Sequence, residues 1–237
     1  MAKYEYKTKI RYNEVDKEGF LTPLALIDLF QTTSTFQSEE LGNGVSVLQN
    51  AHRAWVLSSW QIVMNSMPRF MDDVIIETWS YGIKSALGYR NFALLDADRN
   101  MLVAANSLWV FIDTDTGKPV KPSEETIRLY GSDPKIEMDY APRRITLNES
   151  MIQKEPFEVK YYFIDTNNHM NNEKYILAAT EYLPENVRIH EIRAEYKKQA
   201  RLGEVITPMY YADGNTITVA MYDHTGDHNA TIQFILN

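Results

Sequence analysis

The stretch Ile164-Asp165-Thr166-Asn167-Asn168-His169-Met170-Asn171-Asn172 gathers hydrogen-bonding side chains around one histidine, directly before a helical pattern begins. A core segment is not expected to carry so much polarity without a task. Asp165, Asn167 and His169 alternate, so an extended chain would point all three toward one side, where they can meet a single substrate group. The spacing therefore predicts a functional site.

The same order of features occurs near the start of the chain. Setting Asp16 against Asp165 aligns Thr22 with Asn171 without a gap, each at the start of a helical pattern. Two copies of one unit are therefore expected, although the identity between them is low. The first copy lacks the Asn and His of the polar motif.

Each half is expected to hold one helix and several strands. In the first half, Thr22-Pro23 supplies an N-cap and a proline at the first helical position, and Gly42 supplies a stop for a helix over residues 24–41. In the second half, Asn171 and Asn172 cap a helix that Pro184 ends. Alternating or β-rich segments predict strands at residues 4–12, 54–64, 74–81, 87–97 and 101–112, and again at 157–163, 188–198, 204–212, 216–222 and 230–236.

A long helix wrapped by antiparallel strands, present twice, is the plan of a tandem (double) hotdog fold of the α+β class. We expect the two long helices each to be wrapped by strands that form one extended sheet, because edge pairing hides strands prone to aggregation. The expected domains are residues 1–130, a linker over 131–156 that contains Gly131, Pro134 and Pro142, and residues 157–237.

Composition narrows the class of protein. The 237 residues contain no cysteine, which excludes disulfides, thiolate metal sites and a cysteine nucleophile. A net charge of -8 argues against nucleic acid as the main partner. No apolar run approaches the roughly 18 residues that cross a bilayer, and the start at Met1 has no signal-peptide pattern. We expect a cytoplasmic protein without a metal or other cofactor and without a membrane partner.

The segment from Asp165 to Tyr175 resembles the acyl-acyl carrier protein thioesterases of plants and bacteria, whose motif is approximately D-x-N-x-H-V-N-N-x-K-Y. Only the valine differs, at Met170. Residues 69–79 (R-F-M-D-D-V-I-I-E-T-W) and 107–110 (S-L-W-V) are similar to two further stretches of that family, so the resemblance covers both halves. One departure is Gln199-Ala200, where plant members carry Glu-Cys at or near the active site.

The resemblance implies hydrolysis of a fatty acyl thioester in fatty acid biosynthesis. Such a reaction needs a positioned water, a base, and donors for the developing oxyanion. We expect Asp165 to be the base or to orient water, Asn167 to hold water or the carbonyl, and His169 to act as a neutral donor or a late acid. A structural Asx-turn remains the alternative for Asp165. Gln199 can hydrogen-bond water but cannot take a proton.

In this family the first half is expected to hold the acyl chain. The first helix offers Leu26, Phe30 and Thr33 toward the sheet, and Trp60 is the aromatic residue expected to line the slot. The partner would be an acyl carrier protein with a phosphopantetheine-linked chain, and a homodimer stays open. Two alternatives also stay open: an acyl-CoA thioesterase, and a catalytically weak protein that binds acyl ligands.

Overall fold

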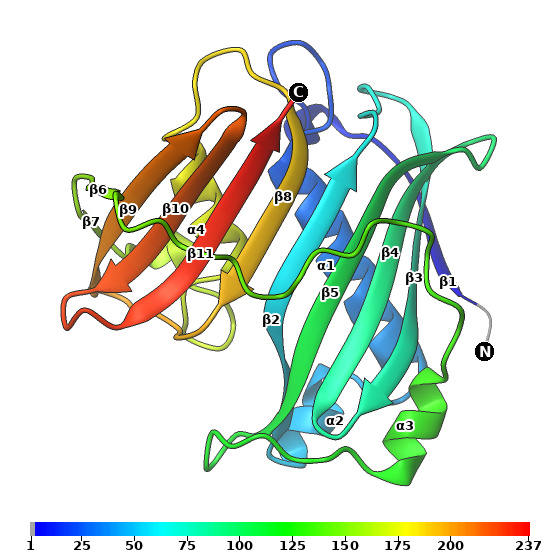
Figure 1. Cartoon of the computed structure of the whole chain (residues 1–237). Helices are drawn as coiled ribbons and strands as arrows, with labels where there is room; N and C mark the ends of the chain where they lie inside the picture. The colour runs from blue at the N-terminus through cyan, green and yellow to red at the C-terminus, as the bar shows by residue number, and fades with distance from the viewer. Residues whose placement is uncertain (1–2) are drawn as a thin grey trace. The chain divides into compact units, whose positions relative to one another are not determined.

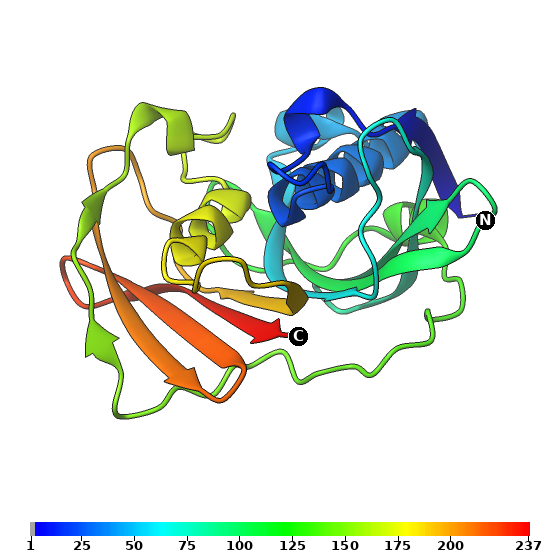
Figure 2. The same ribbon diagram turned by 90° about the horizontal axis from the view of Figure 1, so that it is seen from above.

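The chain divides into two compact units. The computed structural model describes residues 3–237, so Met1 and Ala2 lie outside the described residues. The first predicted domain begins with these two residues, and the signal-peptide prediction also applies to them. One unit comprises residues up to 58 and 62–140, and the other comprises residues 59–61 and 141–237. Each unit has an antiparallel sheet with a helix on one face (Figure 1, Figure 2). The expected class of mixed helix and antiparallel sheet is confirmed in both.

Five strands form the sheet of the first unit, in the order β1-β3-β4-β5-β2. They are β1 (Tyr4–Lys9), β2 (Arg53–Met64), β3 (Asp73–Lys84), β4 (Leu87–Asp96) and β5 (Met101–Asp113). The first strand stops at Lys9, and a 3-10 turn, η1 (Tyr12–Glu14), follows it. Two short helices complete the unit, α2 (Val45–Asn50), which was not predicted, and α3 (Glu124–Tyr130).

The main helix of the first unit, α1 (Pro23–Glu40), begins and ends within one residue of the predicted bounds. The Thr22 hydroxyl oxygen accepts a hydrogen bond from the Ala25 amide at 3.2 Å, which satisfies one of the free amides of the first turn. Gly42 adopts a φ of 69°, a conformation that glycine reaches without strain. The buried face of α1 packs on β4, where the Phe30 and Phe92 rings lie 5.1 Å apart.

The opposite face of this sheet is covered by the chain that follows α3. Indole Nε1 of Trp79 donates to the Pro134 carbonyl at 2.8 Å. Ile136 packs on a hydrophobic cluster formed by Ile75, Trp79, Ala93 and Leu95. The first ten residues of the predicted linker are therefore packed against the first unit.

The sheet of the second unit has the order β8-β11-β10-β9-β6, with β7 also paired to β9. The strands are β6 (Ile152–Gln153), β7 (Phe157–Glu158), β8 (Ile189–Tyr196), β9 (Val205–Asp213), β10 (Thr216–Asp223) and β11 (His228–Leu236). The two-residue β6 lies within the predicted linker. The strand predicted over 157–163 is wrong beyond Glu158, because a 3-10 turn, η2 (Tyr161–Phe163), replaces its end.

The helix of the second unit, α4 (Asn172–Thr180), has nine residues, half the eighteen of α1. It is therefore shorter than expected, and it ends before Pro184. The Thr180 hydroxyl donates to the Leu177 carbonyl at 2.6 Å, so a side chain competes with the backbone for a carbonyl of the last turn. The order of 3-10 turn, loop and helix is nevertheless the same in both units.

Candidate functional site

The polar motif forms a tight loop that Asp165 holds together. Its amide donates to the His169 carbonyl at 2.8 Å. Its carboxylate oxygen Oδ1 accepts from the Asn167 amide at 2.8 Å and the His169 amide at 3.3 Å. Asn168 takes a φ of 61° to close the turn. The extended geometry expected from the alternation is therefore wrong, because the Asp165 side chain turns the backbone instead.

The same loop occurs at Asp16. Its amide donates to Phe20 O at 2.8 Å, and its Oδ1 accepts from the amides of Glu18 and Phe20 at 2.8 and 3.0 Å. Gly19 has a φ of 82° at the position equivalent to Asn168. Asp165 thus has the structural role that an Asx-turn predicts, and any catalytic role would be added to it.

A second segment lies beside the motif. The Met170 amide donates to the Ala200 carbonyl at 2.8 Å, and the Ala200 amide donates to the Tyr175 hydroxyl at 2.9 Å. Gln199 is exposed and directly precedes Ala200. The backbone therefore brings Gln199 to the loop that carries Asp165.

The motif residues differ in burial. Asn167 is exposed, and its side-chain amide lies 3.5 Å from Asp165 Oδ2, at the limit of a hydrogen bond. His169 is half-buried, and its Nδ1 is sealed from solvent without a hydrogen-bond partner within residues 3–237. An imidazolium would need an acceptor for that nitrogen. With no acceptor at Nδ1 among the described residues, the proton of a neutral His169 ring is placed on Nε2.

The helix start beside the motif is capped by Asn171, as expected. Its side-chain oxygen accepts from the Glu173 amide at 3.0 Å. Glu173 is buried and forms an ion pair with Lys174 at 2.7 Å. The Asn171 cap thus stabilises the helix terminus.

One carboxylate near the site was not predicted from the sequence. The Oε2 atom of Glu204 is sealed from solvent without a hydrogen-bond partner in the described part of the chain. Burial raises the pKa of Tyr175 to about 12, and the negative charge of Glu204 adds to that rise. In the sequence, Gly203-Glu204 is typical of a surface turn. Only the proximity of Glu204 to Tyr175 in the structure identifies its carboxylate as a group near the site.

The predicted acyl-binding residues are buried. Leu26, Phe30 and Thr33 share the face of α1 that packs on the sheet of the first unit. Trp60 is also buried, in β2, but it falls in the 59–61 stretch that belongs to the second unit. The three helix residues therefore form one group on the buried face of α1, and the role of Trp60 in an acyl slot stays a prediction.

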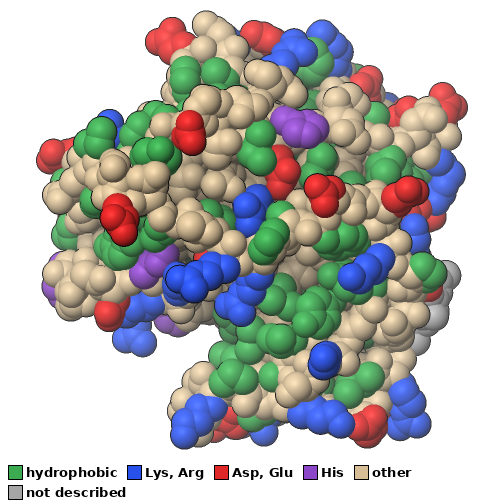
Figure 3. All heavy atoms as spheres, in the orientation of Figure 1, with side chains coloured by type: hydrophobic (Ala, Val, Ile, Leu, Met, Phe, Trp, Pro, Cys, Tyr) green, Lys and Arg blue, Asp and Glu red, His purple; other side chains and the backbone are tan. Residues whose placement is uncertain are grey.

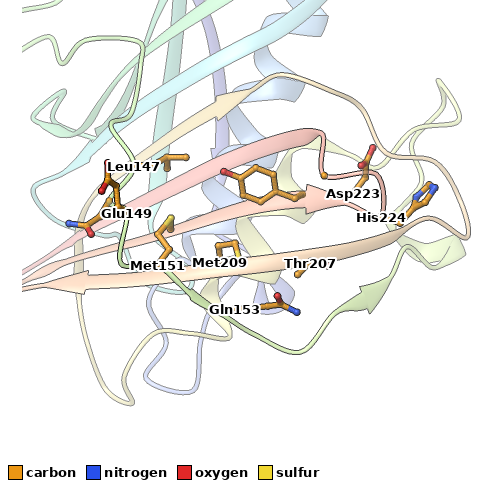
Figure 4. A pocket seen from close by; sticks show the side chains of 11 residues that line it. Leu147, Glu149, Met151, Gln153, Thr207, Met209, Asp223 and His224 are labelled. Atoms are coloured by element: carbon orange, nitrogen blue, oxygen red, sulfur yellow. The ribbon is translucent and has the colours of Figure 1, made fainter.

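A hollow of about 480 Å³ lies on the second unit, between β9, β10 and residues 147–153 (Figure 4). Met151 and Met209 supply apolar walls, and His224 and Asp223 stand at one end. The motif residues Asp165, Asn167 and His169 are not among the lining residues. This hollow is therefore separate from the predicted site.

Two kinds of feature are absent from residues 3–237. No helix in that part of the chain is long and apolar enough to cross a membrane. No group of three or more His, Asp or Glu side chains there is placed to hold a metal ion.

Sequence comparison finds relatives along both halves. The profile of the acyl-ACP thioesterase N-terminal domain matches residues 1–130, and that of the C-terminal domain matches residues 137–235. An acyl-[acyl-carrier-protein] hydrolase, FATB3, of Cuphea viscosissima is 23% identical over 214 residues, 83% of this chain. Oleoyl-acyl carrier protein thioesterase 1 of Arabidopsis thaliana is 24% identical over 227 residues, 86% of this chain. The aligned regions cover 52% and 62% of those two chloroplastic relatives.

Solved structures share the whole fold. An acyl-ACP thioesterase from Bacteroides thetaiotaomicron superposes with a TM-score of 0.89 at 23% identity, covering 98% of this chain and 97% of that one. The 12:0-ACP thioesterase of Umbellularia californica gives 0.88 at 18% identity, covering 99% and 97%. The tandem hotdog fold is confirmed.

Proposed function

Because the chain belongs to the acyl-ACP thioesterase family, we propose that it hydrolyses fatty acyl-acyl carrier protein to a free fatty acid and the carrier. The observation that carries the proposal is the Asp165 loop, which holds a carboxylate, an amide and a half-buried imidazole beside a helix start. A loop with the same backbone hydrogen bonds at Asp16 carries neither the amide nor the imidazole. The additional side chains point to chemistry in the second unit.

In the proposed reaction a water oxygen attacks the thioester carbon. Asp165 takes the water proton directly or orients the water through Asn167, whose side-chain amide lies within reach of Oδ2. A neutral His169 donates from Nε2 to the developing oxyanion. The carbon–sulfur bond then breaks, the electron pair leaves with sulfur, and the thiolate takes up a proton.

The partner follows from the same proposal. Acyl carrier proteins are acidic, so docking would use cations despite the net charge of -8. Arg143, Arg144 and Arg201 are exposed. Lys198 is less available, because its Nζ is held by Asp223 at 2.6 Å and by Asp227 at 2.7 Å. On the face in Figure 3, Lys and Arg side chains are spread among acidic and apolar ones.

We also propose a role in fatty acid biosynthesis and a cytoplasmic location, although the plant relatives are chloroplastic. An acyl-CoA substrate is the nearest alternative, because both substrates share the phosphopantetheine arm. Rates on matched CoA and carrier substrates separate the two. A catalytically weak acyl binder is the other alternative, motivated by Gln199 and Ala200 in place of Glu and Cys.

The test compares the loop at Asp165 with the equivalent loop at Asp16, which serves as the control. Asp165→Asn keeps an oxygen that can accept from the loop amides but removes the base, so release of fatty acid from an acyl carrier substrate should fall by about 100-fold or more. Asp16→Asn makes the same change in the equivalent loop and should leave the rate unaltered. Mass spectrometry of the released acids gives rate and chain length together. Folded Asp165→Asn and His169→Ala variants that both turn over at the parent rate would disprove the site.

A further inference from the structure

The two units share the same backbone around their repeated loops but differ in a few buried side chains. In the second unit the Met170 amide donates to the Ala200 carbonyl at 2.8 Å. In the first unit the equivalent Leu21 amide donates to the Pro68 carbonyl at 2.9 Å. Pro68 is therefore the equivalent of Ala200, the residue that follows Gln199. Because the first unit lacks the Asn and His of the motif, it shows what this segment needs for its shape alone.

A β-bulge lies on the last strand of each sheet repeat. Between β10 and β11 the pairing skips Asn229, whose backbone carbonyl accepts from the amides of Lys197 and Lys198 at 2.8 and 3.2 Å. Between β4 and β5 the pairing skips Leu102 in the same way. The Leu102 carbonyl accepts from the amides of the first two residues after β2, at 3.0 and 3.2 Å. A leucine at this bulge is therefore compatible with the same backbone.

The asparagine of the second unit makes a bond that leucine cannot make. The Asn229 side chain is buried, and its Nδ2 donates to the Lys198 carbonyl at 3.3 Å. Its Oδ1 is sealed from solvent and has no hydrogen-bond partner in the part of the chain that the structure describes. A buried oxygen without a donor costs stability. Stability alone therefore does not account for an asparagine where the first unit has Leu102.

A second buried side chain binds the backbone on the other side of Gln199. The hydroxyl oxygen of Tyr175 accepts from the Ala200 amide at 2.9 Å. The first unit has buried Leu26 at the position equivalent to Tyr175. At the position of Ala200 it has Pro68, which carries no amide hydrogen. The first unit therefore has neither the donor nor the acceptor of this bond.

We propose that Asn229 and Tyr175 are positioning residues for the hydrolysis, which together fix the backbone on both sides of Gln199 close to the Asp165 loop. The inference rests on the proposed function, because it assumes that the motif in this loop carries out the reaction. An amide side chain cannot take a proton, so Gln199 can contribute only by holding water or substrate in place. Such a contribution depends on a fixed backbone, since small displacements of a positioning group lower the rate strongly.

The first test gives the second unit the residue that the first unit has at the bulge. Asn229→Leu should unfold at no lower denaturant concentration than the parent, because an unpaired buried oxygen is removed. Its kcat for an acyl carrier substrate should nevertheless fall by about tenfold or more, with KM within about twofold of the parent value. Leu102→Asn, the reverse change in the first unit, is the matched control and should alter neither constant. An unaltered kcat in Asn229→Leu, or a loss of activity that only follows a loss of stability, overturns the proposal.

The second test establishes whether both residues act through position 199. Gln199→Ala should lower kcat, and adding Asn229→Leu or Tyr175→Phe to it should lower kcat by less than about twofold more. A parent-like kcat in Gln199→Ala, or effects that multiply in the double variants, overturns the proposal. Tyr175→Phe alone should reproduce the loss of kcat, and it decides the matter if Asn229→Leu does not fold.

Hydrogen exchange of the Ala200 amide, followed by NMR, measures how firmly this backbone is held without any turnover. Exchange should be at least about tenfold faster in Tyr175→Phe and in Asn229→Leu than in the parent. The two proposals can therefore fail separately. A parent protein that releases no fatty acid, with faster exchange in both variants, would remove the hydrolase function and leave the fixed backbone at Gln199 in place. Turnover by the parent, with unchanged exchange in both variants, would remove the positioning role and leave the function.

Discussion

Gln199 is the residue at which this chain differs most plainly from the plant acyl-ACP thioesterase motif. Its neighbour Ala200 is hydrogen-bonded through its backbone to Met170 and Tyr175, so the backbone at position 199 lies close to the motif. An amide there can hold water but cannot take its proton. The water chemistry in the proposed mechanism therefore depends on Asp165, whose Oδ1 is already occupied by loop amides.

Gln199→Glu should consequently raise the rate of acyl carrier hydrolysis by about tenfold or more, because it adds a second base of nearly the same size. Single-turnover measurement of acid release separates this chemical effect from product release. Gln49→Glu, the same change at an exposed position of α2, should leave the rate alone. Equal rates for the parent and Gln199→Glu would mean that the amide at position 199 does not lower the rate of hydrolysis.

Sequence reasoning predicts the composition of the candidate site better than its geometry. Asp165, Asn167 and His169 stand out because polar side chains cluster before a helix. Alternation alone suggests an extended chain, whereas Asp165 binds its own backbone and folds the segment into a loop. Glu204 could not be singled out, because a lone charged residue in a turn does not show whether it is buried.

At the level of elements, Lys198 joins the end of β8 to the turn between β10 and β11. Its ammonium group binds the carboxylates of Asp223 and Asp227. The Lys198 hydrogen bond, with help from Thr225, holds the pKa of Asp223 well below its usual range. A depressed carboxyl pKa stabilises the folded state above the unfolded pKa near 4, and that contribution is lost as the pH falls further.

Asp223→Asn should therefore weaken the dependence of stability on acid pH. Denaturant unfolding of the parent protein should show a steeper loss of stability between about pH 5 and about pH 2 than unfolding of the variant. Asp98→Asn, at an exposed hairpin position, should follow the parent. Parallel curves for the parent and Asp223→Asn would contradict the predicted role of this ion pair.

The long elements were predictable because their periodicity extends over many residues. Helix α1 has a cap, a proline start and a glycine stop, and β3, β4 and β5 have long β-rich runs. The short elements α2, β6 and η2 have too few residues to show a period. Tertiary pairing decides them, as in β6, where Ile152 pairs with Tyr210 of β9.

At the scale of the whole molecule, the negative net charge does not by itself predict whether an acidic partner can bind. The chain carries -8, yet Arg143 and Arg144 are exposed side by side. Attraction between exposed charges is screened over about 8 Å at physiological salt. Local cations therefore matter more for docking than the total.

Arg143→Glu should raise KM for an acyl carrier substrate by about tenfold at low salt and leave KM for a small neutral acyl thioester unchanged. Lys84→Glu makes the same change of charge at an exposed position at the end of β3, and should have little effect on either substrate. A KM for the carrier substrate that does not respond to salt or to Arg143→Glu would place docking elsewhere.

Four aspartates, at positions 16, 96, 165 and 223, each accept from the amide four residues later. The residue before that amide has a positive φ each time: Gly19, Arg99, Asn168 and Gly226. Because one carboxylate and the backbone hold this frame, the remaining positions are free to vary without loss of shape. The loop shape therefore does not depend on the residues that would carry the reaction. The loop at Asp165 could acquire Asn167 and His169, while the duplicate loop at Asp16 kept only the shape.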